Sequence, residues 1–138
     1  MTSLTLTNPA GAPAPVGQYS NVALVAPAST VAHVAGQLPV DEQGQVLAPG
    51  DFDRQADIVF DNLSATLDQV GSSLAQVAYI RAFMVDDAAW VPFREARKRA
   101  YAKHGVDVPP PATTLVVKSL YGGALIELDA VAVVDPDQ

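Results

Sequence analysis

Residues 125–134 read LIELDAVAVV, a largely apolar stretch with a strand-like alternation. Successive side chains of a strand point to opposite faces. The first row of side chains is wholly apolar and contains Ile126, Leu128, Ala130, Ala132 and Val134. The second row mixes acids with aliphatic residues and contains Leu125, Glu127, Asp129, Val131 and Val133. Both faces of this strand are thus largely apolar. Since a large exposed apolar patch usually marks an interface, we expect another subunit to cover the face that helices leave open.

Two amphipathic helices precede this strand. The first is predicted over residues 51–70, where apolar side chains recur at gaps of three and four. Asp51 or Asp53 can cap its first turn, and Gly71 ends it. The second helix is predicted over residues 88–104.

Six strands are predicted around these helices, at residues 2–7, 22–26, 30–35, 77–85, 113–120 and 125–134. We expect the second and third strands to form a hairpin through a turn at residues 27–29. The predicted elements follow one another as strands, helix, strand, helix and strands, which is typical of an α+β fold. We expect a six-stranded mixed sheet with two helices packed on one face. A chain of 138 residues suits a single domain over residues 1–138.

The composition excludes several classes of protein. The chain has no Cys, which excludes disulfides, iron–sulfur ligation and a thiol nucleophile, and it has only two His, so we expect no metal and no cofactor. A formal charge of −7 argues against nucleic acid and anionic membranes as partners. The first positive side chain is Arg54, and no apolar run approaches the roughly 18 residues of a membrane span. These features predict a cytoplasmic protein.

Glu127 has the most unusual position of the charged residues, because a carboxylate in an apolar strand needs a partner or a solvated pocket. Two interpretations stay open. Glu127 is either an outward-facing solvated residue or a carboxylate at a cleft wall that acts as a general acid or base. His33 is interpreted as a structural histidine of its strand, and His104 as a residue favoured near a helix C-terminus.

Most of the basic side chains are concentrated in the second helix. Five of the eight lie within ten positions, namely Arg94, Arg97, Lys98, Arg99 and Lys103. At about 100° per residue they scatter around the helix instead of forming one ridge. We therefore expect a solvated helix face and not an anion-binding or RNA-binding surface.

Several short motifs follow one another in a characteristic order. They are Asn8-Pro9-Ala10-Gly11, Pro15-Val16-Gly17-Gln18-Tyr19-Ser20, Val34-Ala35-Gly36-Gln37-Leu38-Pro39, Gln55 with Asn62-Leu63, Pro111-Ala112-Thr113-Thr114 and Ile126-Glu127-Leu128. In this order and spacing the chain, from residue 8 to residue 134, resembles the Rid family of enamine/imine deaminases. That family is also called the YjgF or liver perchloric-acid-soluble protein family.

The resemblance implies a chorismate-mutase-like fold assembled as a homotrimer, with ligand clefts between neighbouring subunits. It implies that Tyr19 and Glu127 are catalytic, Tyr19 closing the cleft and Glu127 positioning the hydrolytic water. The substrate-binding positions that it implies are Ala35, Gly36, Ala112, Thr113 and Thr114.

One position departs from the family pattern. Counting back from Glu127 without a gap places Ala112 where the family has the arginine that binds the substrate carboxylate. Alanine offers neither charge nor donor, and Ala35 also replaces the family's serine. We therefore do not expect 2-iminopropanoate or 2-aminoacrylate as the substrate. Water can still add to an imine carbon with Glu127 and backbone donors, on a ligand without a carboxylate.

The resulting expectation is a Rid-type hydrolase that acts on a small imine, enamine or carbonyl compound in an intersubunit cleft. Two alternatives stay open. One is a non-catalytic trimer that binds a small metabolite or serves as a protein-interaction module. The other is a ribonuclease or translation inhibitor, against which the acidic balance and the scattered basic helix both count.

Overall fold

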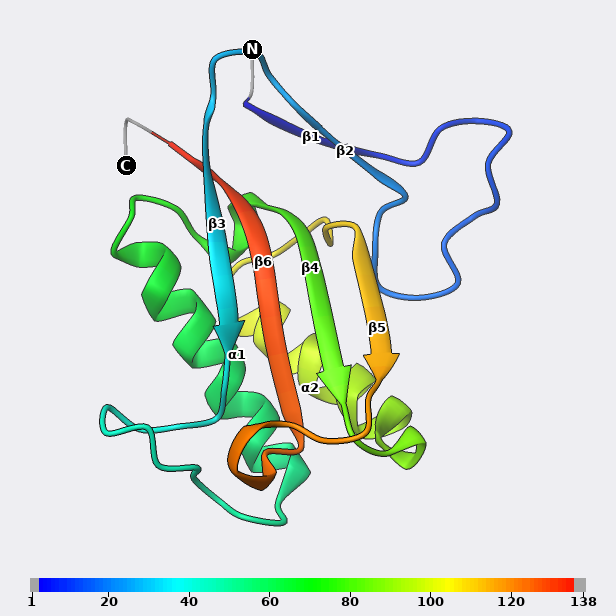
Figure 1. The fold of residues 1–138 in the computed structure, drawn as a ribbon. Helices are drawn as coiled ribbons and strands as arrows, with labels where there is room; N and C mark the ends of the chain where they lie inside the picture. Colours follow the sequence, from blue (N-terminus) through cyan, green and yellow to red (C-terminus); the bar gives the residue numbers. More distant parts are fainter. Residues whose placement is uncertain (1–2, 136–138) are drawn as a thin grey trace.

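The computed structural model describes residues 3–135 of the chain. Its strands are β1 (Leu4–Thr7), β2 (Val22–Val25), β3 (Thr30–Gln37), β4 (Val77–Met84), β5 (Ala112–Val116) and β6 (Ile126–Val134). Its helices are α1 (Phe52–Asp68) and α2 (Trp90–Lys103), with short 3-10 turns at Leu74–Gln76, Asp87–Ala89 and Tyr121–Gly123. Both helices lie behind one mixed sheet in Figure 1, which confirms the predicted α+β fold with two helices on one face.

The six strands form two sheets and not the single sheet that the sequence predicted. Four strands pair in the order β3-β6-β4-β5, with β4 and β5 parallel and the other neighbours antiparallel. β1 and β2 form a separate antiparallel pair, which lies above the upper ends of β4 and β5 in Figure 1. The predicted hairpin is also wrong. A turn does follow β2, where Ala28 has a positive φ of 65°, but it passes the chain from one sheet to the other, and β3 pairs with the apolar β6.

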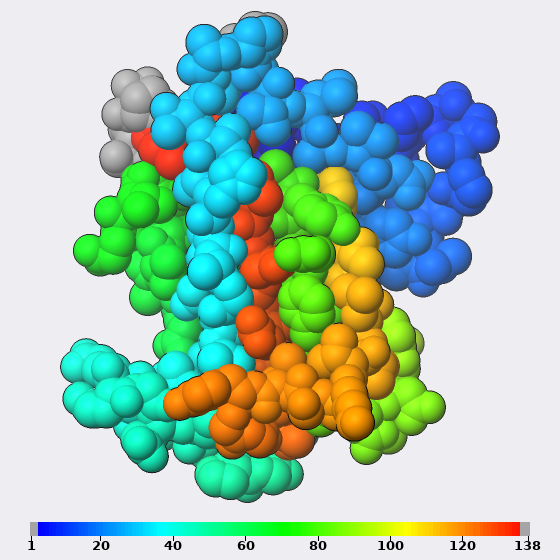
Figure 2. Space-filling view, viewed as in Figure 1, coloured from blue at the N-terminus to red at the C-terminus, as the bar shows by residue number. Residues whose placement is uncertain are grey.

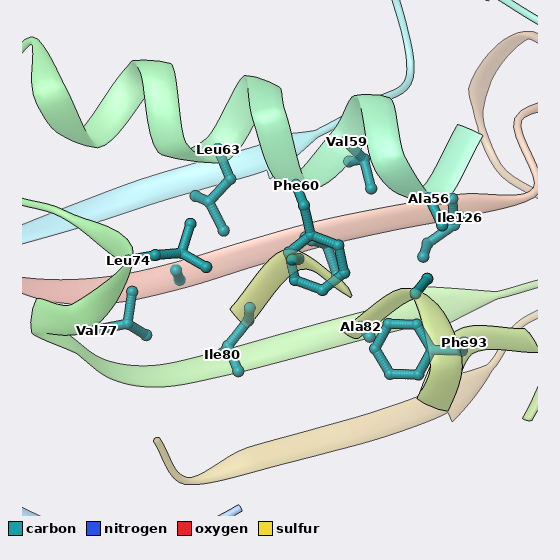
Figure 3. Packing of buried hydrophobic residues seen from close by; sticks show 14 of the residues in the cluster. Ala56, Val59, Phe60, Leu63, Leu74, Val77, Ile80, Ala82, Phe93 and Ile126 are labelled. Carbon is teal, nitrogen blue, oxygen red and sulfur yellow. The ribbon is translucent and has the colours of Figure 1, made fainter. Parts of the chain in front are cut away.

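The core lies between α1, α2 and the sheet. Asp51 caps α1 by accepting a hydrogen bond from the Arg54 N–H at 3.1 Å. The buried stripe of α1 contains Ala56, Val59, Phe60, Leu63 and Leu67. It packs toward β6 and against Phe93 of α2, whose ring stacks on that of Phe60 with centroids 6.2 Å apart. Figure 3 shows the side chains of Val59, Phe60, Leu63 and Phe93 between the helices and the strands.

The predicted alternation of β6 holds over most of its length. Ile126, Leu128, Ala130 and Ala132 are all buried on the helix side. The pattern changes at the end of the strand, where Val133 is fully buried and Val134 is not. The register between β4 and β6 shifts between Val77 and Tyr79 at the same level of the sheet. The pairing of β6 with β3 runs without a shift from Val134 to Ala130, so the alternation of β6 persists and Val133 is buried on the same face as Val131.

The other face of the four-stranded sheet carries no helix, and it is called the open face below. Figure 2 shows its four strands side by side across the front of the molecule. The strand registers assign it His33 and Ala35 of β3, Tyr79, Arg81 and Phe83 of β4, Thr113 and Leu115 of β5, and Glu127, Asp129 and Val131 of β6. Tyr79 and Leu115 are 38% and 39% exposed there. No helix within residues 3–135 is long and apolar enough to cross a membrane.

Candidate functional site

Glu127 occupies the middle strand pair of the open face, opposite Phe83 of β4. Its side chain is half-buried, and it has no hydrogen bond or ion pair with any other described residue. Burial raises the pKa of Glu127 by disfavouring the charged form, and the negative charge of Asp129 raises it further. An unpaired carboxylate with a raised pKa is suited to proton transfer.

Gly36 provides the space that the Glu127 side chain occupies. A Cβ atom at position 36 would overlap the Glu127 carboxylate and would lie 2.8 Å from its Cδ and 3.3 Å from its Cγ. Gly36 lies where the pairing of β3 with β6 shifts between Val34 and Gln37. The glycine and the irregular pairing together let the carboxylate lie directly against the backbone of β3.

Two polar pairs lie beside Glu127 on the open face. Arg81 donates from Nε to Asp129 Oδ1 at 3.0 Å and from Nη2 to Oδ2 at 2.5 Å. The hydroxyls of Tyr79 and Thr113 are 2.5 Å apart. A shallow cavity of about 420 Å³ is lined by Tyr79, Arg81, Asp129 and by Ala35 of the predicted site. Sequence reasoning missed Tyr79 and Arg81, although alternation along residues 77–85 places both on one face.

A second, larger cavity lies on the other side of β5 and is called the helix-side cavity below. Its volume is about 460 Å³. Its walls are Val16, Gly17 and Tyr19 of the loop before β2, Trp90, Val91, Phe93, Arg94 and Arg97 of α2, and Ala112 and Thr114 of β5. The Tyr19 hydroxyl accepts a hydrogen bond from the Val16 N–H at 3.2 Å, which ties the loop to itself.

The predicted site residues therefore fall into two groups within one chain. Tyr19, Ala112 and Thr114 line the helix-side cavity. Glu127, Gly36, Ala35 and Thr113 belong to the open face. The division follows from alternation along β5, because neighbouring side chains of an edge strand point to opposite faces.

The two histidines have different surroundings in the described part of the chain. His104 Nε2 lies 3.1 Å from Asp61 and Nδ1 lies 3.2 Å from Ser64, so His104 has a structural role between the helices. His33 is exposed on the open face and has no hydrogen-bond partner within residues 3–135, so its interpretation as a structural histidine stays a prediction. The described part of the chain contains no group of three or more His, Cys, Asp or Glu side chains that could hold a metal ion.

Comparisons with known proteins cover nearly the whole chain. The family model described as Endoribonuclease L-PSP matches residues 9–134. A RutC family protein of Sulfurisphaera tokodaii is 33% identical over 117 residues, which cover 85% of this chain and 88% of that protein. The 3-aminoacrylate deaminase RutC of Acinetobacter baylyi is 29% identical over 124 residues, 90% of this chain and 93% of that protein.

The fold leads to the same group of proteins. The crystal structure of a Yersinia pestis protein of unknown function from the conserved Rid protein family matches with a TM-score of 0.83 at 22% identity, over 96% of this chain and all of that chain. A family model that matches residues 9–134, together with a relative that is one-third identical, shows that the chain belongs to the Endoribonuclease L-PSP family, also called the Rid or YjgF family.

Proposed function

We propose that this chain is an enamine/imine deaminase-like hydrolase of a small metabolite, with Glu127 as the group that activates water. The half-buried, unpaired carboxylate of Glu127, lying against Gly36, carries this proposal. The name of the Acinetobacter baylyi relative, a 3-aminoacrylate deaminase, is consistent with chemistry of this class.

The proposed reaction converts an imine and water into a carbonyl compound and ammonia. The Glu127 carboxylate accepts a proton from water while the water oxygen forms a bond to the imine carbon. The C=N electron pair moves to nitrogen, which takes up a proton from solvent. The resulting carbinolamine collapses when the protonated Glu127 returns its proton to the nitrogen. The C–N bond then breaks, ammonia leaves, and the C=O bond forms as the hydroxyl group releases its proton to solvent. An enamine enters this sequence after protonation at carbon, which converts it to the imine.

The raised pKa of Glu127 suits this role. A carboxyl group whose pKa is raised is a stronger base once ionised, and it holds the transferred proton more readily than an ordinary carboxylate. The same shift means that activity is lost on the acid side at a higher pH than an ordinary glutamate would give.

We further propose that the working site forms between subunits of a homotrimer. The helix-side cavity with Tyr19 and the open face with Glu127 lie on different sides of one chain. The exposed Tyr79 and Leu115 side chains give the open face apolar surface for a neighbouring subunit. The cavity of one subunit would then meet the Glu127 carboxylate of the next.

A cytoplasmic location stays a prediction.

The substrate is proposed to differ from 2-iminopropanoate. Ala112 lines the helix-side cavity at the position counted as the family's arginine, and it offers no charge from β5. A carboxylate placed against β5 would therefore lack the paired N–H donors that fix its orientation.

The test is a competition assay in which an amino-acid oxidase generates imines and semicarbazide traps them. The protein should lower semicarbazone formation for at least one amino acid of a broad panel. Glu127→Gln should abolish that effect, whereas the exposed control Glu42→Gln should leave it unchanged. No effect over the whole panel, or full activity of Glu127→Gln, would contradict the proposal. A monomer in gel filtration with light scattering would contradict the shared cleft.

A further inference from the structure

We propose that Arg97 is the anion-binding residue of the helix-side cavity, and that the ligand of this cavity joins a carboxylate to a bulky apolar or aromatic portion. The inference deepens the proposed function by naming its substrate class, and it rests on the helix-side cavity being half of the proposed cleft. It also modifies the expectation that the ligand has no carboxylate.

Arg97 differs from every other basic side chain of α2. Arg99 pairs with Asp57 at 3.0 Å, and Lys103 pairs with Asp61 at 2.9 Å. Arg94 and Lys98 lie 3.6 Å and 4.0 Å from Glu95. All four are exposed, whereas Arg97 is half-buried and has no carboxylate within 4.0 Å among residues 3–135. A partly buried charge without a counter-ion is costly because it loses solvation that no partner replaces.

The immediate surroundings of Arg97 hold its guanidinium in place without neutralising it. Its Nε donates to Gln18 Oε1 at 3.2 Å, and its Cζ lies 5.0 Å from the centroid of the Phe93 ring. These contacts occupy one N–H group and one face of the guanidinium. The N–H groups of Nη1 and Nη2 make no hydrogen bond to any described residue. A planar guanidinium with a free edge matches the two oxygens of a carboxylate.

Burial lowers the pKa of Arg97, because the charged form loses solvation and Arg94 adds like charge nearby. A bound anion would offset both effects.

Apart from Arg97, the helix-side cavity is mostly apolar or aromatic, and Arg94 and Thr114 are its other polar side chains. Trp90, Val91 and Phe93 form its α2 wall, and Tyr19 and Ala112 lie across from them. Its volume of about 460 Å³ falls within the roughly 300–1,000 Å³ of ordinary ligand pockets. Two arginines line this pocket, and because Arg94 already lies 3.6 Å from Glu95, Arg97 is the one whose charge selects an anion with an apolar portion.

The position of Arg97 on α2 also determines which part of the ligand can be bulky. The cation reaches the cavity from α2, while Ala112 on β5 contributes no charge. The carboxylate is thus held beside α2, and the space left at Ala112 accommodates a larger apolar group than an arginine there would allow. A carboxylate-bearing imine or enamine with a bulky apolar or aromatic portion fits this arrangement.

Benzoate and its neutral analogue benzamide test the proposal, with the fluorescence of Trp90 as the readout. Trp90 is the only tryptophan of the chain and lines the cavity. Benzoate should bind the intact protein and change this fluorescence, and benzamide should bind roughly tenfold or more weakly. Arg97→Gln should weaken benzoate binding by a similar factor and remove the preference over benzamide. Arg97→Lys should recover only part of it, because an ammonium group lacks the planar fork.

Arg99→Gln is the matched control, since it removes a charge from the same helix outside the cavity. It should bind benzoate as the unmodified protein does, and thermal melting should show that both variants are folded. Three results would each overturn the proposal: no benzoate binding to the unmodified protein, equal binding of benzoate and benzamide, or unchanged benzoate binding by a folded Arg97→Gln variant.

These outcomes are distinguishable from failure of the proposed function. Glu127→Gln should lose imine hydrolysis but retain benzoate binding. Arg97-dependent benzoate binding without any imine hydrolysis would refute the hydrolase and leave the anion site. If the protein hydrolyses imines and Arg97→Gln leaves benzoate binding unchanged, only the anion site would be refuted.

Discussion

Replacing Gly36 by alanine should remove most of the imine hydrolase activity and leave the fold intact. The added methyl carbon would lie 2.8 Å from Glu127 Cδ, whereas ordinary van der Waals contact begins at 3.4 Å. The carboxyl carbon must therefore move by about 0.6 Å, and its nearer oxygen by more. Because a misplacement of about 1 Å can cost roughly 100-fold in rate, we expect a fall of about 10- to 100-fold in kcat/KM.

The cost in stability should be small. The φ angle of Gly36 lies outside the left-handed region, so alanine introduces no backbone strain there. The Glu127 side chain is half-exposed and can rotate away, and alanine also lowers the entropy of the unfolded chain by an amount worth about 0.4–1 kcal/mol. Initial rates in the oxidase and semicarbazide assay, with melting curves on the same samples, measure both effects. A folded Gly36→Ala variant with full activity, alongside an inactive Glu127→Gln variant, would refute this reasoning.

Three further predictions concern stability. Gln55 is buried and makes three hydrogen bonds to backbone groups of residues 47, 48 and 125, so Gln55→Leu should lose about 3 kcal/mol in urea unfolding. An equal loss in the exposed control Gln43→Leu would contradict this origin. Burial raises the pKa of Tyr101 to about 12, and its hydroxyl has no partner within residues 3–135. Tyr101→Phe should therefore raise the free energy of unfolding by about 1 kcal/mol, and a loss of that size would count against it. Desolvation raises the pKa of Asp61, but hydrogen bonds from two basic side chains outweigh it, so the folded pKa lies below the unfolded one. The stabilisation from Asp61 is then present above the unfolded pKa and lost as pH falls through the folded pKa. Melting temperatures of the natural protein and Asp61→Asn should converge between neutral pH and about pH 3, and a constant difference would refute the linkage.

Local periodicity made much of the fold predictable. The helix predicted over residues 51–70 is α1, and the strand predicted over residues 125–134 is β6, because each pattern repeats along a single element. The pairing of strands was not predictable in the same way. β2 and β3 are adjacent in sequence, yet β3 finds its partner about 100 residues away. Burial of β6 between β3 and β4 decides that pairing, and no short window of sequence contains both partners.

The arrangement of the candidate site also depends on contacts that the sequence does not reveal. Motifs indicated Tyr19 and Glu127, but alternation along β5 determines that Ala112 faces the helix-side cavity while Thr113 faces Tyr79. The special position of Arg97 depends on which acids α1 offers to α2. Five basic residues in one helix look equivalent in sequence, and only packing shows which one lacks a partner.

Mixed trimers provide a direct measurement of the proposed shared cleft. Tyr19→Ala removes the cavity half and Glu127→Gln removes the open-face half, so each variant alone should be inactive. The two variants are mixed in equal amounts, unfolded and refolded together. If each cleft takes Tyr19 from one subunit and Glu127 from its neighbour, one of the four random combinations of neighbours has both natural residues. The proposed arrangement predicts recovery of about a quarter of the activity of the unmodified protein. No recovery from well-folded mixed trimers would contradict a cleft formed between subunits.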